Sequence, residues 1–418
     1  MSFFSSLSRR RRRTMVGAGI ATLTIAGFGI YRVTSDGPDA VPVNVDFILG
    51  GGADVNGRGD KLATPGTYQG LAAASAGTVY LFTQETDGMV MWRKKPSGAV
   101  ERIPVSGVNE AQAEQAAVAP DGSVYLAAGD LWKISPKGKA TKIIDTRCKK
   151  HTPLATLVSK FCTGQVTGVS IARDGSVYIG DQVILGDDAS YVHRLDGDSI
   201  KLVAGRPPAA GESYKLSNPA VKNGIDPSSG TKATDVLVTD NLNSGWLAFD
   251  KEGLYWRNGP GIVRINHDGT LSPVVAAKSP RKIAETKGPF DSVGRALDAE
   301  IRRNISDATR GDLAVIPGRG EVYYSDGGAK YKPTKEGPFR WRDVVSDSQK
   351  KLIDESTNGK LVYLVKAGKL APVIAGVQAI ATSEDALYIA VESESGNDRE
   401  NPENWSTAVL RLQLPNTK

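Results

Sequence analysis

The feature that most constrains the fold of this chain is a phrase that it repeats. "APDGSVYLAA" at 119–128 and "ARDGSVYIGD" at 172–181 share a small residue, a charged glycine turn, Ser-Val-Tyr and an apolar run. Recurrence of this kind indicates one supersecondary unit that has been copied. A search for the same order of strands and turns finds six copies, which begin at Gly70, Ala116, Gly168, Gly245, Gly311 and Gln378.

Each copy contains alternating apolar strands of about five residues that are separated by turn dipeptides such as DG and SG. The first strand of each copy is rich in small residues, which suit a strand crowded around an axis. Four strands in each of six units predict an all-β six-bladed β-propeller over residues 44–418. The fifth copy is interrupted and resumes at Lys360.

The sixth copy stops after three strands, near Leu414, and so lacks a fourth. Residues 44–50, "NVDFILG", resemble the fourth strands "IKLVAG" and "APVIAG" of other copies. We therefore expect the N-terminal strand to complete the last blade and to bring Phe47 beside Leu410. Closure of this kind removes open sheet edges.

The positive charge of the chain belongs to its N-terminal segment. The formal net charge is +6, but six of the 52 basic residues lie in residues 1–34, which hold no acid. The rest of the chain has 46 basic and 46 acidic residues. A neutral body lacks the basic surface that a phosphate backbone requires, so we expect no nucleic-acid partner.

Residues 14–31 are eighteen consecutive uncharged residues that follow five arginines. This pattern predicts a cytoplasmic tail over 1–13, a transmembrane signal anchor over 14–33, a linker over 34–43, and an extracytoplasmic propeller. The alternative is a cleaved signal, of the general secretory or the twin-arginine type, which would release the propeller as a secreted protein.

Cys148 and Cys162 are the two cysteines of the chain and are separated by thirteen residues. In an oxidising compartment such a local pair is most simply a disulfide that pins the loop between them. A metal site would need more ligands than these two thiols and His151 supply.

The repeats resemble NHL repeats, specifically those of the teneurin-like or bacterial secreted subtype. In that subtype a Val-Ala-Gly strand end leads to a loop of the form G-x-G-D-G-G-P-A-T. This chain has "LGGGADVNGRGDKLAT" at 49–64, "VAGRPPAAGESYKLSNPAVKNGIDPSSGTKAT" at 203–234 and "DSVGRALDAEI" at 291–301, with Lys61 and Leu62 in place of expected glycines. The resemblance implies the propeller fold. It leaves the function open, because such propellers include adhesion modules, sensor domains and some enzymes.

The long insertions all fall on one face when the loops are sorted by the strands that they join. They cover 146–165, 205–243, 278–309, 328–359 and 393–405. Long loops held by a rigid scaffold are typical of binding surfaces, although drift and a lid over the channel would give the same pattern. Within 338–356 the spacing of apolar residues suggests a short helix, and we take as interface candidates Phe339, Arg340, Trp341 and Arg342.

The second strands end near this same face in six residues that we expect at the mouth of the channel: Gln84, Asp130, Asp181, Arg257, Asp326 and Glu392. Four acids in this set suggest a site for a cation such as Ca²⁺, which prefers oxygen ligands. The alternative is that these residues cap turns. The three histidines are spread over different parts of the predicted fold, which disfavours a His-ligated zinc, and no catalytic motif is present.

These observations favour a membrane-anchored binding propeller that recognises a protein or glycan through its long-loop face, with no catalytic residues and no cofactor. The alternative is a metal-dependent hydrolase or lactonase that uses the carboxylates at the channel mouth.

Overall fold

The computed structural model describes residues 44–50, 59, 62–108, 113–146, 151–182, 189–208, 230–238, 245–258, 261–275, 294–295, 312–326, 339–340, 360–394 and 405–413. The predicted tail, anchor and linker over 1–43 lie outside this part of the chain. Within the described residues, no helix has the length and hydropathy that a membrane span requires.

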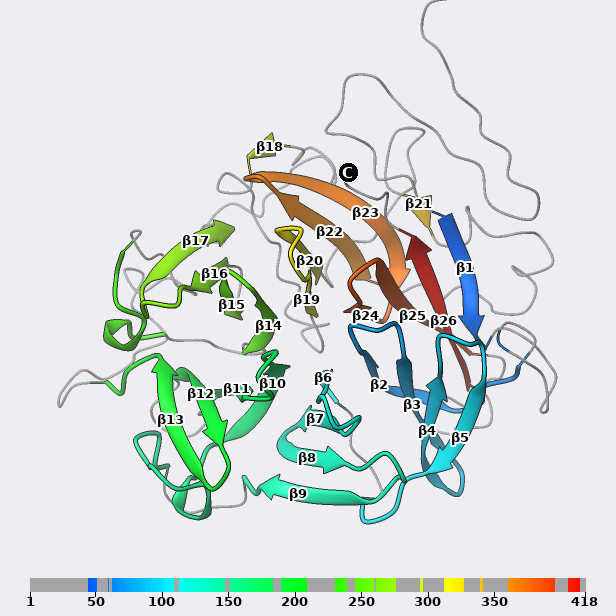
Figure 1. Ribbon diagram of the computed structural model, residues 1–418, viewed down its shortest axis with the longest axis horizontal. Coiled ribbons are helices and arrows are strands. Elements are labelled where there is room, and N and C mark those ends of the chain that lie inside the picture. The colour runs from blue at the N-terminus through cyan, green and yellow to red at the C-terminus, as the bar shows by residue number, and fades with distance from the viewer. Residues whose placement is uncertain are drawn as a thin grey trace, which may run out of the picture.

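The described residues form six sheets arranged in a ring, each with four antiparallel strands as its core (Figure 1). Blade 1 contains β2 (Thr67–Ala73), β3 (Val79–Glu85), β4 (Gly88–Lys94) and β5 (Val100–Pro104). Blade 2 contains β6 (Gln115–Val118), β7 (Val124–Ala128), β8 (Asp130–Ile134) and β9 (Ala140–Ile144). Blade 3 contains β10 (Gln165–Ile171), β11 (Val177–Gln182), β12 (Ser190–Asp196) and β13 (Ser199–Ala204).

Blade 4 contains β14 (Trp246–Asp250), β15 (Gly253–Asn258), β16 (Gly261–Ile265) and β17 (Leu271–Val275). Blade 5 contains β19 (Leu313–Ile316), β20 (Glu321–Asp326), β22 (Lys360–Lys366) and β23 (Lys369–Val377). Blade 6 contains β24 (Ala379–Thr382), β25 (Ala386–Glu394), β26 (Trp405–Gln413) and β1 (Asn44–Leu49). The predicted six-bladed propeller is confirmed.

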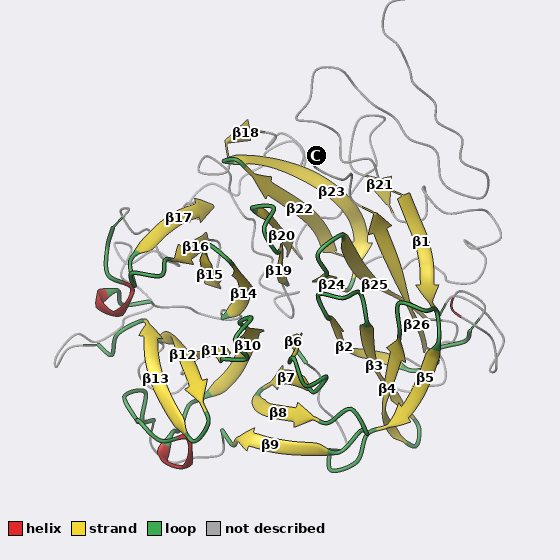
Figure 2. Cartoon of the chain, viewed as in Figure 1, coloured by secondary structure: helices red, strands yellow, loops and turns green. Residues whose placement is uncertain are grey.

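The ring closes as the sequence predicts. β1 pairs with β26 in the last blade, and Phe47 lies opposite Leu410. The first strands β2, β6, β10, β14, β19 and β24 each contact the first strands of both neighbouring blades, so they surround the axis (Figure 2). The hydrophobic clusters lie between blades: Phe47 and Leu410 of blade 6, for example, pack with Tyr323 of blade 5.

The repeated phrase has a structural explanation in the turn between first and second strands. Asp121 accepts a hydrogen bond of 2.9 Å from the backbone N–H of Ser123, and Asp174 accepts one of 2.9 Å from Ser176. Gly122 has a φ of 77° between Asp121 and Ser123, a left-handed conformation that favours glycine. The sequence "DGS" therefore specifies one turn geometry, which occurs in both blade 2 and blade 3.

The tyrosine of the phrase lies opposite a basic residue of the third strand in five blades, as in Tyr125 with Lys133 and Tyr178 with Arg194. In four blades that base forms an ion pair with the acid of the turn: Asp121–Lys133, Asp174–Arg194, Glu252–Arg264 and Asp385–Arg411. The same three residue types thus meet at the same place in successive blades.

Blade 5 carries two additional short strands on its outer strand, β23. β18 (Gly294–Arg295) pairs with it in the antiparallel sense, and β21 (Phe339–Arg340) pairs with it in parallel. These strands belong to the long insertions 278–309 and 328–359. Each of the two insertions therefore contributes a strand to the edge of the same blade. The assignment of the insertions to one face of the propeller did not predict this pairing.

Candidate functional site

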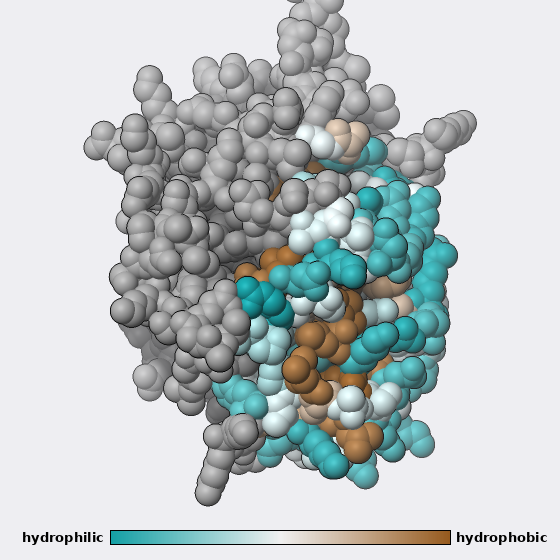
Figure 3. Space-filling view, turned by 90° about the vertical axis from the view of Figure 1, so that its left-hand side faces the viewer, coloured by the Kyte–Doolittle hydropathy of each residue, from teal (hydrophilic) through white to brown (hydrophobic). Residues whose placement is uncertain are grey.

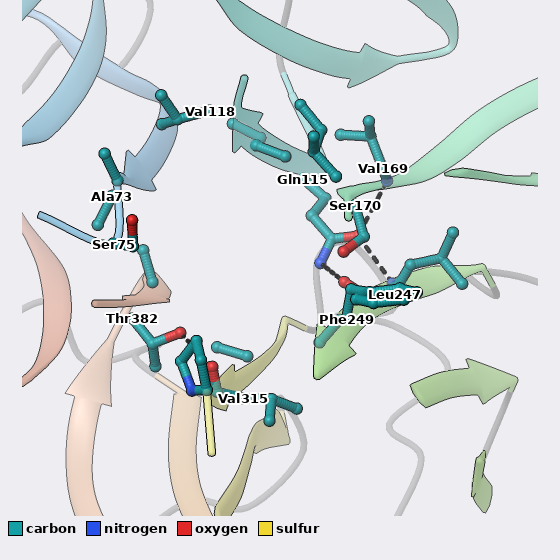
Figure 4. A pocket seen from close by; sticks show the side chains of 18 of the residues that line it. Ala73, Ser75, Gln115, Val118, Val169, Ser170, Leu247, Phe249, Val315 and Thr382 are labelled. Carbon is teal, nitrogen blue, oxygen red and sulfur yellow. Dashed lines mark hydrogen bonds between the residues drawn. The ribbon is translucent and has the colours of Figure 1, made fainter. Parts of the chain in front are cut away.

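A cavity of about 720 Å³ lies on the axis of the propeller, inside the ring of first strands. Small and apolar residues of these strands make most of its wall, among them Ala73, Ala117 and Ala248. The first-to-second turns also line it, so it opens on the face of short turns. Figure 4 shows Ser75 and Thr382 on one wall, and Gln115 with Ser170 on the other.

Gln115 closes the inner end of this cavity. Its Oε1 accepts hydrogen bonds from the backbone N–H groups of Val169 (3.0 Å) and Leu247 (2.9 Å). Its Nε2 donates to the carbonyl oxygens of Leu247 (2.7 Å) and Leu313 (3.1 Å). One amide side chain on blade 2 therefore ties blades 3, 4 and 5, and it reaches across the axis because blade 5 lies opposite blade 2 (Figure 4).

Gln115 is a site residue that the sequence reasoning missed. By register it occupies the position held by Gly70 in blade 1 and Gly168 in blade 3. A long polar side chain among small residues at the start of an inner strand was the available signal. The edges of the inner strands present unpaired backbone groups to the axis, and the amide satisfies four of them.

Two buried carboxylates in the cavity wall join neighbouring blades. Asp250 Oδ1 accepts a hydrogen bond of 2.8 Å from the backbone N–H of Gly318, which links blade 4 to blade 5. Asp312 Oδ2 accepts one of 3.0 Å from Ile380, which links blade 5 to blade 6. Both carboxylates are almost fully buried. The wall is therefore held together by polar contacts between blades as well as by apolar packing.

The six residues predicted at the channel mouth are engaged mainly within or between their own blades. Asp130 forms an ion pair of 2.6 Å with Lys142 and accepts hydrogen bonds from the N–H (2.9 Å) and hydroxyl (2.8 Å) of Thr146. Burial by itself would raise the pKa of Asp130, but these hydrogen bonds outweigh it and lower the pKa. Asp130 thus fastens the end of blade 2, as the capping alternative predicts.

Asp181 lies in a buried network beneath the loop of the two cysteines. Its Oδ2 accepts a hydrogen bond of 2.6 Å from the Thr163 hydroxyl, and its Oδ1 is 3.3 Å from His193 Nδ1. The other ring nitrogen, Nε2, is 2.8 Å from the carbonyl oxygen of Pro153. The Phe161 ring packs edge-on against the imidazole, with centroids 4.7 Å apart. Asp181 and His193 together hold this loop against blade 3.

Cys162 is buried at the end of the same loop. Cys148 lies outside the described residues, so the Cys148–Cys162 disulfide stays a prediction. Leu154 and Leu157, in the middle of this loop, are the two large apolar side chains that are exposed among the described residues. Elsewhere the described surface is mostly hydrophilic in the side view of Figure 3, with hydrophobic residues toward its middle.

The remaining predicted residues are also occupied locally. Arg257 is buried, donates to the carbonyl oxygen of Ser325, and packs over the rings of Trp246 (5.0 Å) and Tyr324 (5.5 Å). Glu392 Oε1 accepts a hydrogen bond of 2.7 Å from the N–H of Tyr68, and Gln84 Nε2 donates one of 3.1 Å to the Glu85 carbonyl. Asp326 ends β20, and its side chain lies outside the described part.

The described carboxylates predicted at the channel mouth contact protein groups. Asp130 contacts Lys142 and Thr146, Asp181 accepts from the Thr163 hydroxyl, and Glu392 accepts from a backbone N–H. Nowhere in the part of the chain that the structure describes do three or more His, Cys, Asp or Glu side chains gather as a metal would require. The contacts of Asp130 and Glu392 match the capping alternative, and calcium binding at the channel mouth stays a prediction.

The interface candidates of the long-loop face are described only in part. Phe339 and Arg340 form β21, while the side chains of both, and all of Trp341 and Arg342, lie outside the described residues. The same holds for the helix suggested over 338–356. Recognition of a protein or glycan by this face stays a prediction.

No protein-family model and no curated protein matches the chain. Similar solved structures include a protein of unknown function from Bacteroides thetaiotaomicron, with 14% identity, 94% of this chain and 83% of that chain covered, and a TM-score of 0.47. An auxiliary nutrient binding protein from Bacteroides ovatus has 10% identity, 92% and 82% coverage, and a TM-score of 0.46. A gluconolactonase from Xanthomonas campestris has 11% identity, 94% and 97% coverage, and a TM-score of 0.44. At these identities the likeness concerns the propeller alone, and the NHL subtype stays a prediction.

Proposed function

We propose that this protein binds a small organic molecule in the axial cavity of its propeller. The observation that supports this is the cavity itself, with a volume of about 720 Å³ and an inner end that Gln115 closes. Ligand pockets of proteins generally enclose about 300–1,000 Å³ and combine an apolar wall with a few placed polar groups. A pocket of this size admits a metabolite and excludes a folded protein.

Of the two functions that the sequence suggests, the alternative of a hydrolase or lactonase also concerns a small molecule, but it uses carboxylates at the long-loop end, whereas this cavity opens at the short-turn end. A hydrolase or lactonase would bind a small molecule and also cleave it. Two similar structures, a gluconolactonase and a nutrient binding protein, suggest which molecules to try first. The binding that we propose uses the cavity wall and does not invoke a metal.

The test is a ligand screen on the full-length protein by thermal shift, followed by calorimetry on each hit, with sugars, sugar lactones, organic acids and amino acids as probes. Ala74 lies at the cavity wall near its opening, where a larger side chain would narrow the entrance. We expect Ala74→Phe to weaken the binding of each hit by about tenfold or more, equivalent to about 1.4 kcal/mol.

The matched control is Ala99→Phe, because Ala99 is exposed in the third-to-fourth turn of blade 1 and does not line the cavity. Hits that bind both variants equally well would place the ligand elsewhere and overturn the proposal. Absence of any hit would do the same. Turnover of a lactone that Ala74→Phe abolishes would establish the hydrolase form.

A further inference from the structure

The mouth of the axial cavity is made by one equivalent turn from each blade, and the residues of these turns differ in charge. The turn residues that line the opening are Ser75, Pro120, Arg173, Lys251, Pro317 and Glu384. Three of them are small or apolar. Three are charged, and all three charged residues are exposed at the opening.

The charges beside these residues are neutralised within their own blades. Asp174, next to Arg173, pairs with Arg194 at 3.7 Å, and Asp385, next to Glu384, pairs with Arg411 at 2.6 Å. Glu252, next to Lys251, likewise pairs with the third strand of its blade. Among the described residues, by contrast, the side chains of Arg173, Lys251 and Glu384 make no ion pair or hydrogen bond.

The free charges are separated by sign. Arg173 and Lys251 belong to blades 3 and 4, which are neighbours in the ring, and Glu384 belongs to blade 6. Blade 6 lies across the axis from blade 3 (Figure 1). The opening therefore has a cationic side and an anionic side, and the wall between them is mostly apolar apart from the buried Asp250 and Asp312.

We propose that the ligand of the axial cavity is a zwitterion of amino-acid or short-peptide type, which rests on the function proposed above. Its carboxylate binds at Arg173 and Lys251, because a guanidinium matches a carboxylate with two parallel hydrogen bonds. Its ammonium group binds at Glu384. Apolar side chains of the ligand lie along the wall, which Val118, Val315 and Phe249 help to form.

Both charges are needed for specificity. A ligand group of the wrong sign on either side is repelled by the charge there and loses the matching partner, which disfavours its binding. A simple anion would meet Glu384, and a simple cation would meet Arg173 and Lys251. Only a molecule with separated charges of both signs complements the whole opening.

The experiment uses the dipeptide leucyl-alanine as the probe, with its N-acetyl and C-amide forms, in calorimetry with the full-length protein. We expect the free dipeptide to bind at least about tenfold more tightly than either blocked form. Arg173→Gln should weaken the free and N-acetyl forms and leave the amide form unchanged. Glu384→Gln should weaken the free and amide forms and leave the N-acetyl form unchanged.

Lys201→Gln is the control, since Lys201 has the same charge but is exposed on β13 of blade 3 and does not line the cavity. It should leave all three affinities unchanged. Equal affinity for the free and blocked forms, or no binding of any of them, overturns the zwitterion proposal. The function proposed above would survive that result if uncharged hits from the screen still lose affinity in Ala74→Phe. Both proposals would be overturned if no hit loses affinity in Ala74→Phe.

Discussion

The two ends of the propeller axis are built in different ways. At the short-turn end, blades 2, 3, 4 and 6 repeat one arrangement of a turn acid and a third-strand base beside a tyrosine. At the other end each blade has its own contacts: Asp130 binds Lys142 and Thr146, whereas Asp181 binds Thr163 and faces His193. Gln115 separates the two ends on the axis.

The difference indicates which parts of each copy are structural. A contact that recurs at the same place in several blades serves the blade, because every blade needs the same turn. A residue that differs from its equivalents in the other blades is a better candidate for a functional role. Arg173, Lys251 and Glu384 differ within otherwise regular turns, and Gln115 differs from the glycines at its register position in blades 1 and 3. These residues meet at one cavity.

Ring closure stabilises the propeller at both ends of its axis, so the loss of closure has the largest expected effect on folding. A chain that begins at residue 51 lacks β1 and leaves the edge of β26 open in blade 6. We expect this truncation to abolish cooperative unfolding and to promote aggregation, in contrast to a chain that begins at residue 40. Circular dichroism during urea titration, with light scattering, measures both. A truncated chain that unfolds as cooperatively as its control would show that closure is dispensable.

Gln115→Ala tests the role of Gln115 in joining the blades on the axis, between the two ends of the propeller. The substitution leaves four backbone groups without their hydrogen-bond partner, among them the N–H and C=O of Leu247. Each unsatisfied buried group costs about 1–3 kcal/mol, with some relief from water entering the cavity, so we expect a loss of about 3 kcal/mol or more in the free energy of unfolding. Gln84→Ala, which removes a single hydrogen bond, is the control. Equal losses in the two variants would contradict the role assigned to Gln115.

His193→Phe concerns the long-loop end alone. It deprives the Pro153 carbonyl and Asp181 of a polar neighbour, which we expect to cost about 1–3 kcal/mol and to loosen the loop over residues 151–165. Trypsin cleavage after the exposed Lys160, followed by mass spectrometry after reduction, measures the loosening. His267→Phe, in an exposed turn at the other end, should leave the cleavage rate unchanged. Ligand affinity in the axial cavity should stay the same in His193→Phe, because His193 lies at the opposite end.

The smallest expected effects come from single carboxylates at the two ends of blade 2. Burial would raise the pKa of Asp121 and that of Asp130, but hydrogen bonds and the nearby charges of Lys133 and Lys142 outweigh it and lower both pKa values. Each carboxylate therefore stabilises the fold above the ordinary pKa of about 3.8, and this contribution is lost as the pH falls through the lower folded-state pKa.

Asp121→Asn and Asp130→Asn should each cost about 1 kcal/mol or less near neutral pH, and the difference from the unsubstituted protein should disappear in strong acid. Asp130→Asn should have the larger effect, because Asp130 is less exposed and has more hydrogen bonds. Urea unfolding as a function of pH measures both. A difference that grows on acidification would reverse the sign of the proposed contribution.

Much of the fold was predictable because the same pattern of strands and turns occurs in several copies, so each copy supports the interpretation of the others. A turn such as "DGS" and the alternation of the strands recur, and the three-strand sixth copy required a partner that 44–50 could supply. The candidate site was less predictable. The second-strand ends formed a plausible ring of acids in sequence, but Asp130 and Asp181 turn to neighbours, Lys142 and His193, that come from adjacent strands and are visible only once the strands are paired.

The sequence by itself determined the number of blades, the order of their strands and the closure of the ring, because these depend on periodic patterns and turn chemistry that act over a few residues. Only the tertiary structure decided where the axis is closed and which charges remain free. The contacts of Gln115 join residues up to 198 positions apart. Whether Arg173 or Asp174 finds an ion-pair partner depends on which of two adjacent side chains faces the third strand. Such choices are made by packing, and no local pattern records them.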